Sequence, residues 1–369
     1  FMRIKLLLIL MIIASLLIIN RKILARIPRI AVIFPQDKNN LNDVGNVLNC
    51  MVSAVFETKK KEGKIFEYEN FNDGRNVIKT MSVAEEIVQK HFDVALGTTL
   101  SSQAIIVSDI LDKAGVPFFS PLATHPNIVF GKKYSVRLSF NDDRQGKVLA
   151  QFSLKNIPTI KSLLVIENLS HPYSTYLSEK YLKELLQRKK GVKVMTIKYI
   201  DGFFPRDDIV AYLKHNTPEL IFAPIYSLDV AKIYAILAKS SKKKMVFLTS
   251  DTIGTALDKT FYDAMGAENN FIHFYFGQQN PKIFLGKNVD KFKSIFQKYC
   301  SRYALSVNAA AAFDIANATL NVLFSKKYDD KPASFRKILK EIKYQGVLGD
   351  LIFDKDNEPI KSVYIYQIK

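Results

Sequence analysis

Short apolar runs and longer segments of helical period alternate through most of the chain. The runs are rich in β-branched and aromatic residues, which is typical of strands buried on both faces of a sheet. Because helical segments separate them, the pattern predicts parallel sheets covered by helices, an α/β fold. The expected strands are Ile30–Phe34, Phe92–Leu96, Val116–Phe119, Leu163–Ile166, Val192–Ile200, Leu220–Ala223 and Met245–Thr249.

Helices are predicted where apolar residues recur every three or four positions. One begins near Asn42, and another carries Val77, Met81, Ala84 and Val88 on one face. The other expected helices are Ser102–Ala114, Arg144–Leu154, Ser174–Arg188, Asp207–His215 and Leu228–Ala238.

The strands fall into two series, one on each side of the polar segment Asn141–Asp143. A chain of 369 residues is longer than one ordinary domain requires, so we expect two lobes. No Pro- or Gly-rich linker separates the two series. Lobes joined in this way are typical of chains that cross between domains more than once, at strand-like segments that act as hinges.

The N-terminus carries a targeting signal. Arg3 and Lys5 precede the apolar stretch Leu6–Ile19, which is shorter than the roughly 20 residues that span a bilayer comfortably. We interpret residues 1–27 as a signal peptide or an N-terminal membrane anchor, and cleavage stays open because Ile23 is a poor match to the small residue expected before Ala25. Both interpretations predict a periplasmic or extracellular location.

Composition argues against two other kinds of partner. The formal net charge is +18, but Lys and Arg are spread along the chain. The densest cluster, Lys242–Lys244, is typical of a solvated turn, so no nucleic-acid partner is expected. Cys50 and Cys300 have no neighbours at metal-ligand spacing, so no metal is expected. They are either a disulfide of an exported chain or free thiols, and the sequence leaves both readings open.

Enzyme motifs are missing from the sequence. It contains no Gly-rich phosphate loop, no nucleophile elbow and no His-Glu-x-x-His motif. His125 and His171 are expected at a polar rim. A catalytic pairing of Ser101 with His125 has no orienting carboxylate in the sequence. We therefore expect no enzyme and no cofactor.

Two loops carry candidate ligand-binding residues. Open parallel sheets bind ligands beyond the carboxyl ends of their strands, and the segments Thr98–Ala104 and Ser120–Pro126 each follow a predicted strand. Both are rich in hydroxyl groups and carry no side-chain carboxylate or ammonium. This favours an anionic group held by neutral hydrogen bonds and a helix dipole. The alternative is that Ser101 and Thr124 cap or stabilise turns.

Several motifs occur together in a specific order. The segments Gly97–Ala104 (Gly-Thr-Thr-Leu-Ser-Ser-Gln-Ala), Ala114–Pro117 (Ala-Gly-Val-Pro) and Ser120–Pro126 (Ser-Pro-Leu-Ala-Thr-His-Pro) resemble the type I periplasmic solute-binding proteins of the leucine/isoleucine/valine receptor family. Tyr134–Gly146 resembles that family's first crossover, and Gly346–Gln367 resembles its final strands. The resemblance covers nearly all of the chain from Pro28 to Lys369.

The resemblance implies two Rossmann-like lobes with parallel central sheets and three hinge crossovers. The first lobe would contain residues 28–140 with 279–346, and the second 141–278 with 347–369. The crossovers are expected near Ser139–Asp143, Phe274–Gln278 and Gly346–Leu351.

The resemblance also implies a binding site and a function. The ligand-binding residues it implies are Ser101, Leu122 (through its backbone), Ala123 and Thr124 for an α-carboxylate, with Tyr173, Tyr226 and Asp251 from the second lobe. Asp251 would meet an α-ammonium. The two tyrosines have a second reading as half-buried core residues, and Asp251 as a turn or helix cap.

The function implied is an extracytoplasmic receptor that delivers an amino acid or similar small polar solute to ABC permease subunits in the membrane. The alternative is a membrane-tethered sensing module that signals to a partner protein. Leu122 and the segment Gln36–Asp43 depart from the family pattern, so the sequence does not name the ligand.

Overall fold

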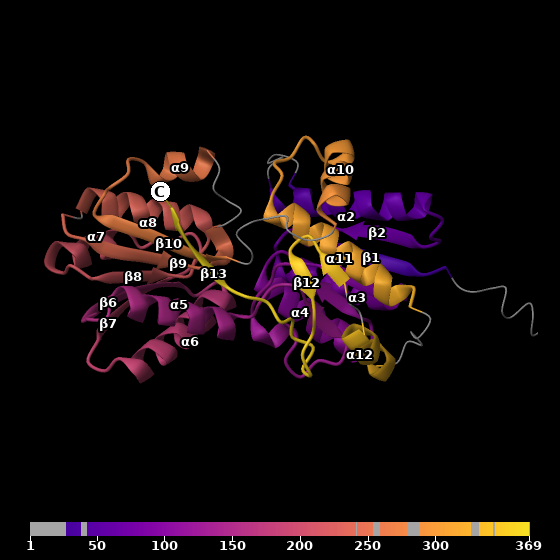
Figure 1. The fold of residues 1–369 in the computed structure, drawn as a ribbon, viewed down its shortest axis with the longest axis horizontal. Coiled ribbons are helices and arrows are strands. Elements are labelled where there is room, and N and C mark those ends of the chain that lie inside the picture. The colour runs from indigo at the N-terminus through magenta and orange to yellow at the C-terminus, as the bar shows by residue number, and fades with distance from the viewer. Residues whose placement is uncertain are drawn as a thin grey trace, which may run out of the picture.

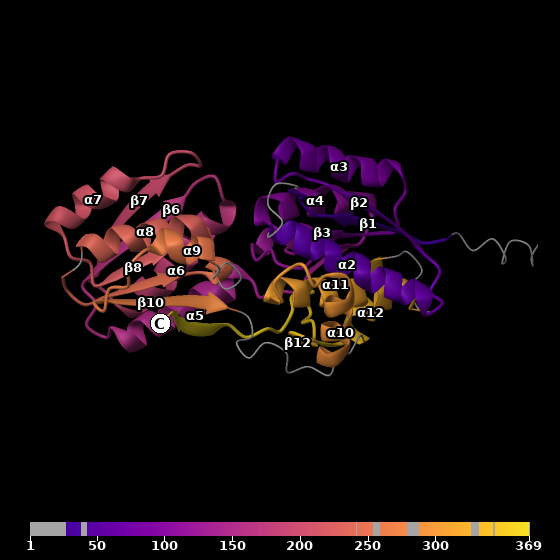
Figure 2. The ribbon, with the colours of Figure 1, turned by 90° about the horizontal axis from the view of Figure 1, so that it is seen from above.

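The computed structural model describes residues 27–37, 43–240, 242–253, 259–278, 288–325, 332–341 and 344–368. Two central sheets form two lobes that lie side by side (Figures 1 and 2). The α/β class and the parallel central sheets expected from the sequence are therefore confirmed.

The first lobe contains a parallel sheet in the order β2-β1-β3-β4-β5. Its strands are β1 (Arg29–Ile33), β2 (Glu67–Phe71), β3 (Val94–Gly97), β4 (Phe118–Ser120) and β5 (Ser135–Arg137). Its helices are α2 (Val44–Lys61), α3 (Val77–Gln89), α4 (Ser101–Ala114), the 3₁₀ turn η1 (Pro126–Ile128), α10 (Val289–Tyr299), α11 (Val307–Leu323) and α12 (Pro332–Glu341).

Helices cover both faces of this sheet. Successive residues of a strand point to opposite faces. On β1, Ile30 and Val32 pack with α2, α10 and α11, while Ala31 and Ile33 pack with α3 and α4. Burial on both sides explains why β1, β3 and β4 are mostly apolar, without a regular alternation of apolar and polar residues.

The second lobe contains a sheet in the order β13-β10-β9-β8-β6-β7, parallel except for β13, which is antiparallel to β10. Its strands are β6 (Ser162–Asn168), β7 (Lys193–Tyr199), β8 (Leu220–Ala223), β9 (Met245–Thr249), β10 (Ile272–Gln278) and β13 (Tyr364–Ile368). Helices α5 (Asp142–Asn156) and α6 (Pro172–Arg188) cover one face. The other face holds α7 (Arg206–His215), α8 (Ser227–Ser240), α9 (Lys259–Met265) and the 3₁₀ turn η2 (Asp251–Ile253).

The sequence pattern missed one strand of the first lobe and predicted the buried face of α3 only in part, since Ala84 is buried and Val88 packs against the same cluster. The edge strand β2 was not expected, because it is mostly polar and buries only Phe71. In α3 the buried face contains Thr80 and Val83, whereas Val77 and Met81 are 49% and 44% exposed. Thr80 tolerates burial because its hydroxyl donates to the Asn76 carbonyl one turn earlier, 2.8 Å away.

The last passage between the lobes also lies further along the chain than expected. The resemblance places residues from 347 onward in the second lobe, but Val347, Leu351 and Phe353 pack in the apolar cluster of the first. The reason is a small antiparallel hairpin of β11 (Tyr344–Gly346) and β12 (Gly349–Leu351), which holds this segment in place. Of the strands within residues 344–368, only β13 joins the sheet of the second lobe.

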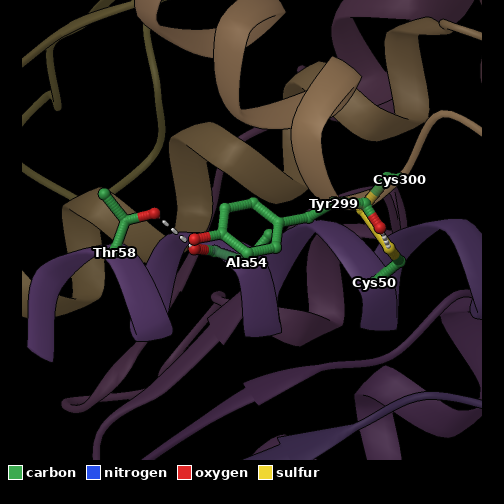
Figure 3. The surroundings of a disulfide bond; sticks show 5 residues. All are labelled: Cys50, Ala54, Thr58, Tyr299 and Cys300. Carbon is green, nitrogen blue, oxygen red and sulfur yellow. Dashed lines mark hydrogen bonds between the residues drawn. A yellow bond between two sulfur atoms is a disulfide. The ribbon is translucent and has the colours of Figure 1, made fainter. Parts of the chain in front are cut away.

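Cys50 on α2 and Cys300, directly after α10, form a disulfide with Cα atoms 6.0 Å apart (Figure 3). Of the two readings that the sequence left open, the structure contains the bonded one. Beside the bond, the ring of Tyr299 lies along α2 near Ala54 (Figure 3). The disulfide joins residues 250 positions apart within one lobe. After the chain has returned from the second lobe, the disulfide links it covalently to α2 of the first lobe.

Among the described residues, no helix is both long and apolar enough to cross a bilayer. The signal peptide or anchor predicted for residues 1–27 lies outside the described residues, apart from Ile27.

Candidate functional site

Ser101 stands where strand β3 ends and helix α4 begins. Gly97 at the end of β3 lies so close to β1 that a Cβ atom there would be 2.2 Å from the Ile33 carbonyl oxygen, so only glycine fits. No side chain caps α4, and the N–H groups of its first turn therefore lack a side-chain acceptor. A helix start of this kind favours an anion.

The loop after β4 lies against this helix start. The backbone N–H of His125 donates to Ser101 Oγ at 3.4 Å. Thr124 is only 4% exposed, and its hydroxyl lies beside the Asp142 carboxyl group. Ala123 is buried, and Leu122 packs at the edge of the α2 and α11 cluster. The predicted residues of the first lobe thus lie in two adjoining loops at the carboxyl edge of the sheet.

His125 differs from its predicted place at a polar rim, because it is 6% exposed. Burial, together with the charge of Arg137, lowers the pKa of His125 to about 4, so its ring is neutral at physiological pH. Its Nδ1 atom accepts a hydrogen bond from the Asn127 N–H at 3.2 Å. Ser101 meets the backbone of His125 rather than its ring, so the two side chains do not form a nucleophile and base.

Tyr173, Tyr226 and Asp251 lie beyond the ends of β6, β8 and β9. The rings of Tyr173 and Tyr226 are 5.1 Å apart, and His171 meets Tyr226 edge-on at 4.5 Å. Burial raises the pKa of both tyrosine hydroxyls, and the negative charge of Asp251 adds to the effect. The structure therefore brings the three predicted residues of the second lobe into one cluster.

Asp251 belongs to a pair of unusual carboxyl groups. Its Oδ1 accepts a 2.9 Å hydrogen bond from Nε2 of Gln145 on α5, yet burial raises its pKa to about 6. Asp142, one turn before Gln145, is completely buried, and neither of its carboxylate oxygens makes a hydrogen bond of standard geometry. Burial and the charge of Asp251 raise the pKa of Asp142 well above its usual range.

The two clusters face each other where the lobes touch. The His125 ring of the first lobe packs 4.6 Å from the ring of Tyr176 on α6, and the Tyr176 hydroxyl donates to Asp143 at 3.0 Å. Arg75 follows β2, and its positive charge acts on Tyr226 of the second lobe. Asp43 holds Arg75 through an ion pair of 2.6 Å.

Sequence reasoning did not predict Asp142, Gln145, Arg75 or Asp43 as site residues. A signal was present for two of them, since Asp142 and Gln145 are three positions apart at a helix start and so share a face. The pairing of Arg75 with Asp43 joins two loops that follow different strands. No local pattern indicates it.

Within the described ranges, no group of three or more His, Cys, Asp or Glu side chains is arranged to hold a metal ion. Two cavities lined by described residues lie away from the clusters. One, of about 390 Å³, borders the disulfide and α2, and the other, of about 570 Å³, borders β7 and Phe203. Neither is lined by a predicted site residue.

Comparison with known proteins agrees with this architecture. A curated Leu/Ile/Val-binding protein, BraC3 of Rhizobium johnstonii, is 25% identical in an alignment of 249 residues that covers 60% of this chain and 68% of that protein. The fold is similar to the crystal structure of a leucine-binding protein, LivK, from Thermotoga maritima, with a TM-score of 0.77 and 19% identity over 93% of this chain and 96% of that one. It is also similar to a solute-binding protein of an ABC transporter from R. palustris in complex with 4-hydroxybenzoate, with a TM-score of 0.75 and 16% identity over 93% of each chain.

These structural likenesses establish the fold alone. The family follows from a separate match, in which the model of the periplasmic binding proteins covers residues 40–369. The resemblance inferred from the loop motifs is therefore confirmed, and this chain belongs to the periplasmic binding protein family.

Proposed function

We propose that this protein is the extracytoplasmic solute-binding component of an ABC transporter, that it binds an amino acid between its lobes, and that it performs no chemistry on the ligand. The observation that carries the proposal is the uncapped helix start at Ser101 in one lobe together with the half-buried carboxyl group of Asp251 in the other. A zwitterion presents opposite charges to these two groups.

The first lobe supports the carboxylate end of this proposal. Ser101, the start of α4 and the Thr124 hydroxyl offer hydrogen-bond donors without a competing cation among the predicted residues. Neutral donors together with a helix start stabilise an anion and restrict its orientation. Leu122 and Ala123 would contribute through the backbone of the same loop.

The second lobe supports the ammonium end. A half-buried carboxyl group with a pKa of about 6 lacks sufficient compensation for its negative charge. A ligand ammonium would supply that compensation through a charge-assisted hydrogen bond. Tyr173 and Tyr226 flank Asp251 and would cover the ligand with their rings.

Two domains that are linked by several chain passages close over a ligand by bending at those passages. We place the boundaries between the two lobes at residues 140 and 278 and after the β11–β12 hairpin. Closure would present the liganded form to permease subunits in the membrane, outside the cytoplasm. Small-angle scattering should show a smaller radius of gyration with saturating ligand.

The decisive experiment is calorimetry of the purified protein with leucine, with its deaminated analogue and with 4-hydroxybenzoate. The proposal predicts that leucine or another amino acid binds, that the deaminated analogue binds at least tenfold more weakly, and that Asp251→Asn removes this preference. Ligand-dependent stimulation of ATP hydrolysis by the reconstituted permease would then separate transport from sensing. Equal affinity for leucine and for its deaminated analogue would contradict the proposal.

A second candidate ligand is an aromatic carboxylate. The cluster of three aromatic rings formed by His171, Tyr173 and Tyr226 favours a flat ring, and one structural neighbour was crystallised with 4-hydroxybenzoate. An aromatic acid has no ammonium, so this candidate predicts tighter binding of 4-hydroxybenzoate than of any amino acid and little effect of Asp251→Asn.

A further inference from the structure

Arg137, the last residue of β5, is a buried cation that joins two distant segments. Its Nη1 donates to the His125 carbonyl at 2.9 Å, and its Nη2 donates to the Pro126 carbonyl at 3.0 Å. The same Nη2 donates at 2.9 Å to Oε1 of Glu358, 221 residues further along the chain. The Arg137 side chain has no exposed surface, and the Glu358 side chain is 17% exposed.

One end of this connection is the loop of residues 120–126, which we call the ligand loop. Three other carbonyls of this loop accept hydrogen bonds from the first passage between the lobes. The Leu138 N–H donates to the Ser120 carbonyl at 3.0 Å, the Ser139 hydroxyl to the Ala123 carbonyl at 2.9 Å, and the Asp142 N–H to the Thr124 carbonyl at 3.0 Å. The ligand loop is therefore hydrogen-bonded at its start and near its end to the chain that leads into the second lobe.

The other end is the return segment, residues 352–363, which runs from β12 in the first lobe to β13 in the second. Glu358 is fixed within it, because its N–H donates to Asp354 Oδ1 at 3.0 Å. Three residues later, Lys361 Nζ donates to the Leu348 carbonyl of the first lobe at 3.1 Å, while the Lys361 carbonyl accepts from Arg144 of the second. Rotation of the lobes must therefore bend the chain close to Lys361.

We propose that Arg137 is a positioning residue that couples the ligand loop to the return segment, so that a change in the loop alters the angle between the lobes. The coupling to ligand rests on the function proposed above. Guanidinium donors have a fixed planar geometry, and a buried cation that loses an acceptor is strongly destabilised. The carbonyls of the ligand loop and the Glu358 carboxylate must therefore move as one unit.

A test without ligand uses amide hydrogen exchange of the full chain. The N–H groups of Ile128 and Phe130 donate to the same His125 and Pro126 carbonyls that Arg137 binds, so their exchange reports on the ligand loop. Glu358→Gln should raise exchange at residues 127–130 about tenfold and leave the amides of β1 and β3 unchanged. Arg137→Lys, which keeps the charge but loses the planar donors, should act in the same way.

The matched control is Glu62→Gln. It removes a 2.9 Å ion pair to Lys291 that also joins distant segments, 229 positions apart, but on the surface. It should leave exchange at residues 127–130 unchanged. The proposal would be overturned if Glu358→Gln left amide exchange at residues 127–130 unchanged, or raised it equally in β1 and β3. Either result would show that Arg137 only stabilises the structure.

A second arm measures leucine affinity in a double-mutant cycle of Arg137→Lys and Glu358→Gln. Each substitution alone should weaken binding about tenfold, and the double variant should bind no more weakly than the weaker single variant, because one coupling can be broken only once. Strictly additive losses would overturn the coupling. If the wild-type protein binds no amino acid, the proposed function fails, and the exchange arm still decides whether the loop and the return segment are coupled.

Discussion

Gln145 on α5 donates a hydrogen bond of 2.9 Å from Nε2 to Oδ1 of Asp251, which lies 106 residues later in the chain. The bond favours the ionised carboxylate, but burial has the larger effect and keeps the pKa of Asp251 at about 6. Asp251 therefore changes its charge just below neutral pH, in the middle of the proposed ammonium site.

The first prediction is a pH dependence of amino acid affinity. Only the ionised form of Asp251 can pair with an ammonium, so affinity should be constant above about pH 7 and fall about tenfold per pH unit well below pH 6. Calorimetry between pH 4.5 and 8 measures this. Asp251→Asn should bind about ten- to a hundredfold more weakly at pH 8 and lose the dependence. If the affinity of the wild-type protein did not change between pH 4.5 and 8, the pairing of Asp251 with the ligand ammonium would be refuted.

The second prediction concerns Asp142, whose buried carboxylate makes no hydrogen bond of standard geometry. Burial raises its pKa above the value of about 3.9 in the unfolded chain. The folded protein thus holds this proton more tightly, and the stabilisation it contributes at low pH is lost as pH rises through the folded pKa. Asp142→Asn should raise the free energy of unfolding at pH 8 by about 1–3 kcal/mol and change it little near pH 4.

Asp314 on α11 provides the matched contrast in urea unfolding. Burial also raises its pKa, to about 6, but its oxygens accept hydrogen bonds from the N–H groups of Val347 and Leu348 and from the Tyr344 hydroxyl. Asp314→Asn replaces one acceptor oxygen by a donor and should lower stability at pH 8. If Asp142→Asn and Asp314→Asn changed the free energy of unfolding equally, burial alone, and not hydrogen bonding, would determine the effect of each carboxyl group on stability.

The third prediction concerns the Tyr173 hydroxyl, which is buried near Ser250 and Thr252 without a hydrogen bond of standard geometry. Tyr173→Phe removes a poorly satisfied polar group and keeps the ring contact with Tyr226. The melting temperature should therefore stay constant or rise. If the hydroxyl binds ligand, affinity should fall by about tenfold. A lower melting temperature with unchanged affinity would make Tyr173 a core residue only.

The fourth prediction concerns the disulfide between Cys50 and Cys300. It closes a loop of 250 residues, so removing it should increase the entropy of the unfolded chain and lower the free energy of unfolding by about 2–5 kcal/mol. Urea unfolding of the oxidised protein, the reduced protein and Cys50→Ser measures the change. The reduced protein and the variant should agree, and coincidence of all three curves would mean that the sulfurs are not bonded.

The fold class and the places where a site can form follow from local features of the amino-acid sequence. Apolar runs such as Leu220–Ala223 are local features, and their alternation with helices predicts parallel strands whose carboxyl ends share one edge. Ser101, Thr124, Tyr226 and Asp251 each follow such a run. Their assembly into two clusters was therefore predictable from residues adjacent in the chain, together with the order of motifs that resembles one family.

Other features depend on which surfaces meet in the folded protein, and these are seen only in the three-dimensional arrangement. It decided that β2 is an edge strand without an apolar run, which face of α3 is buried, and that residues 347–353 stay with the first lobe. It also decided that the thiols of Cys50 and Cys300 lie close enough to bond. Burial, which depends on the packing of distant segments, determines the pKa of Asp142 and Asp251. The link from Arg137 to Glu358 spans 221 residues, and such a hydrogen bond leaves no periodic pattern in the sequence because neither partner is constrained by its neighbours in the chain.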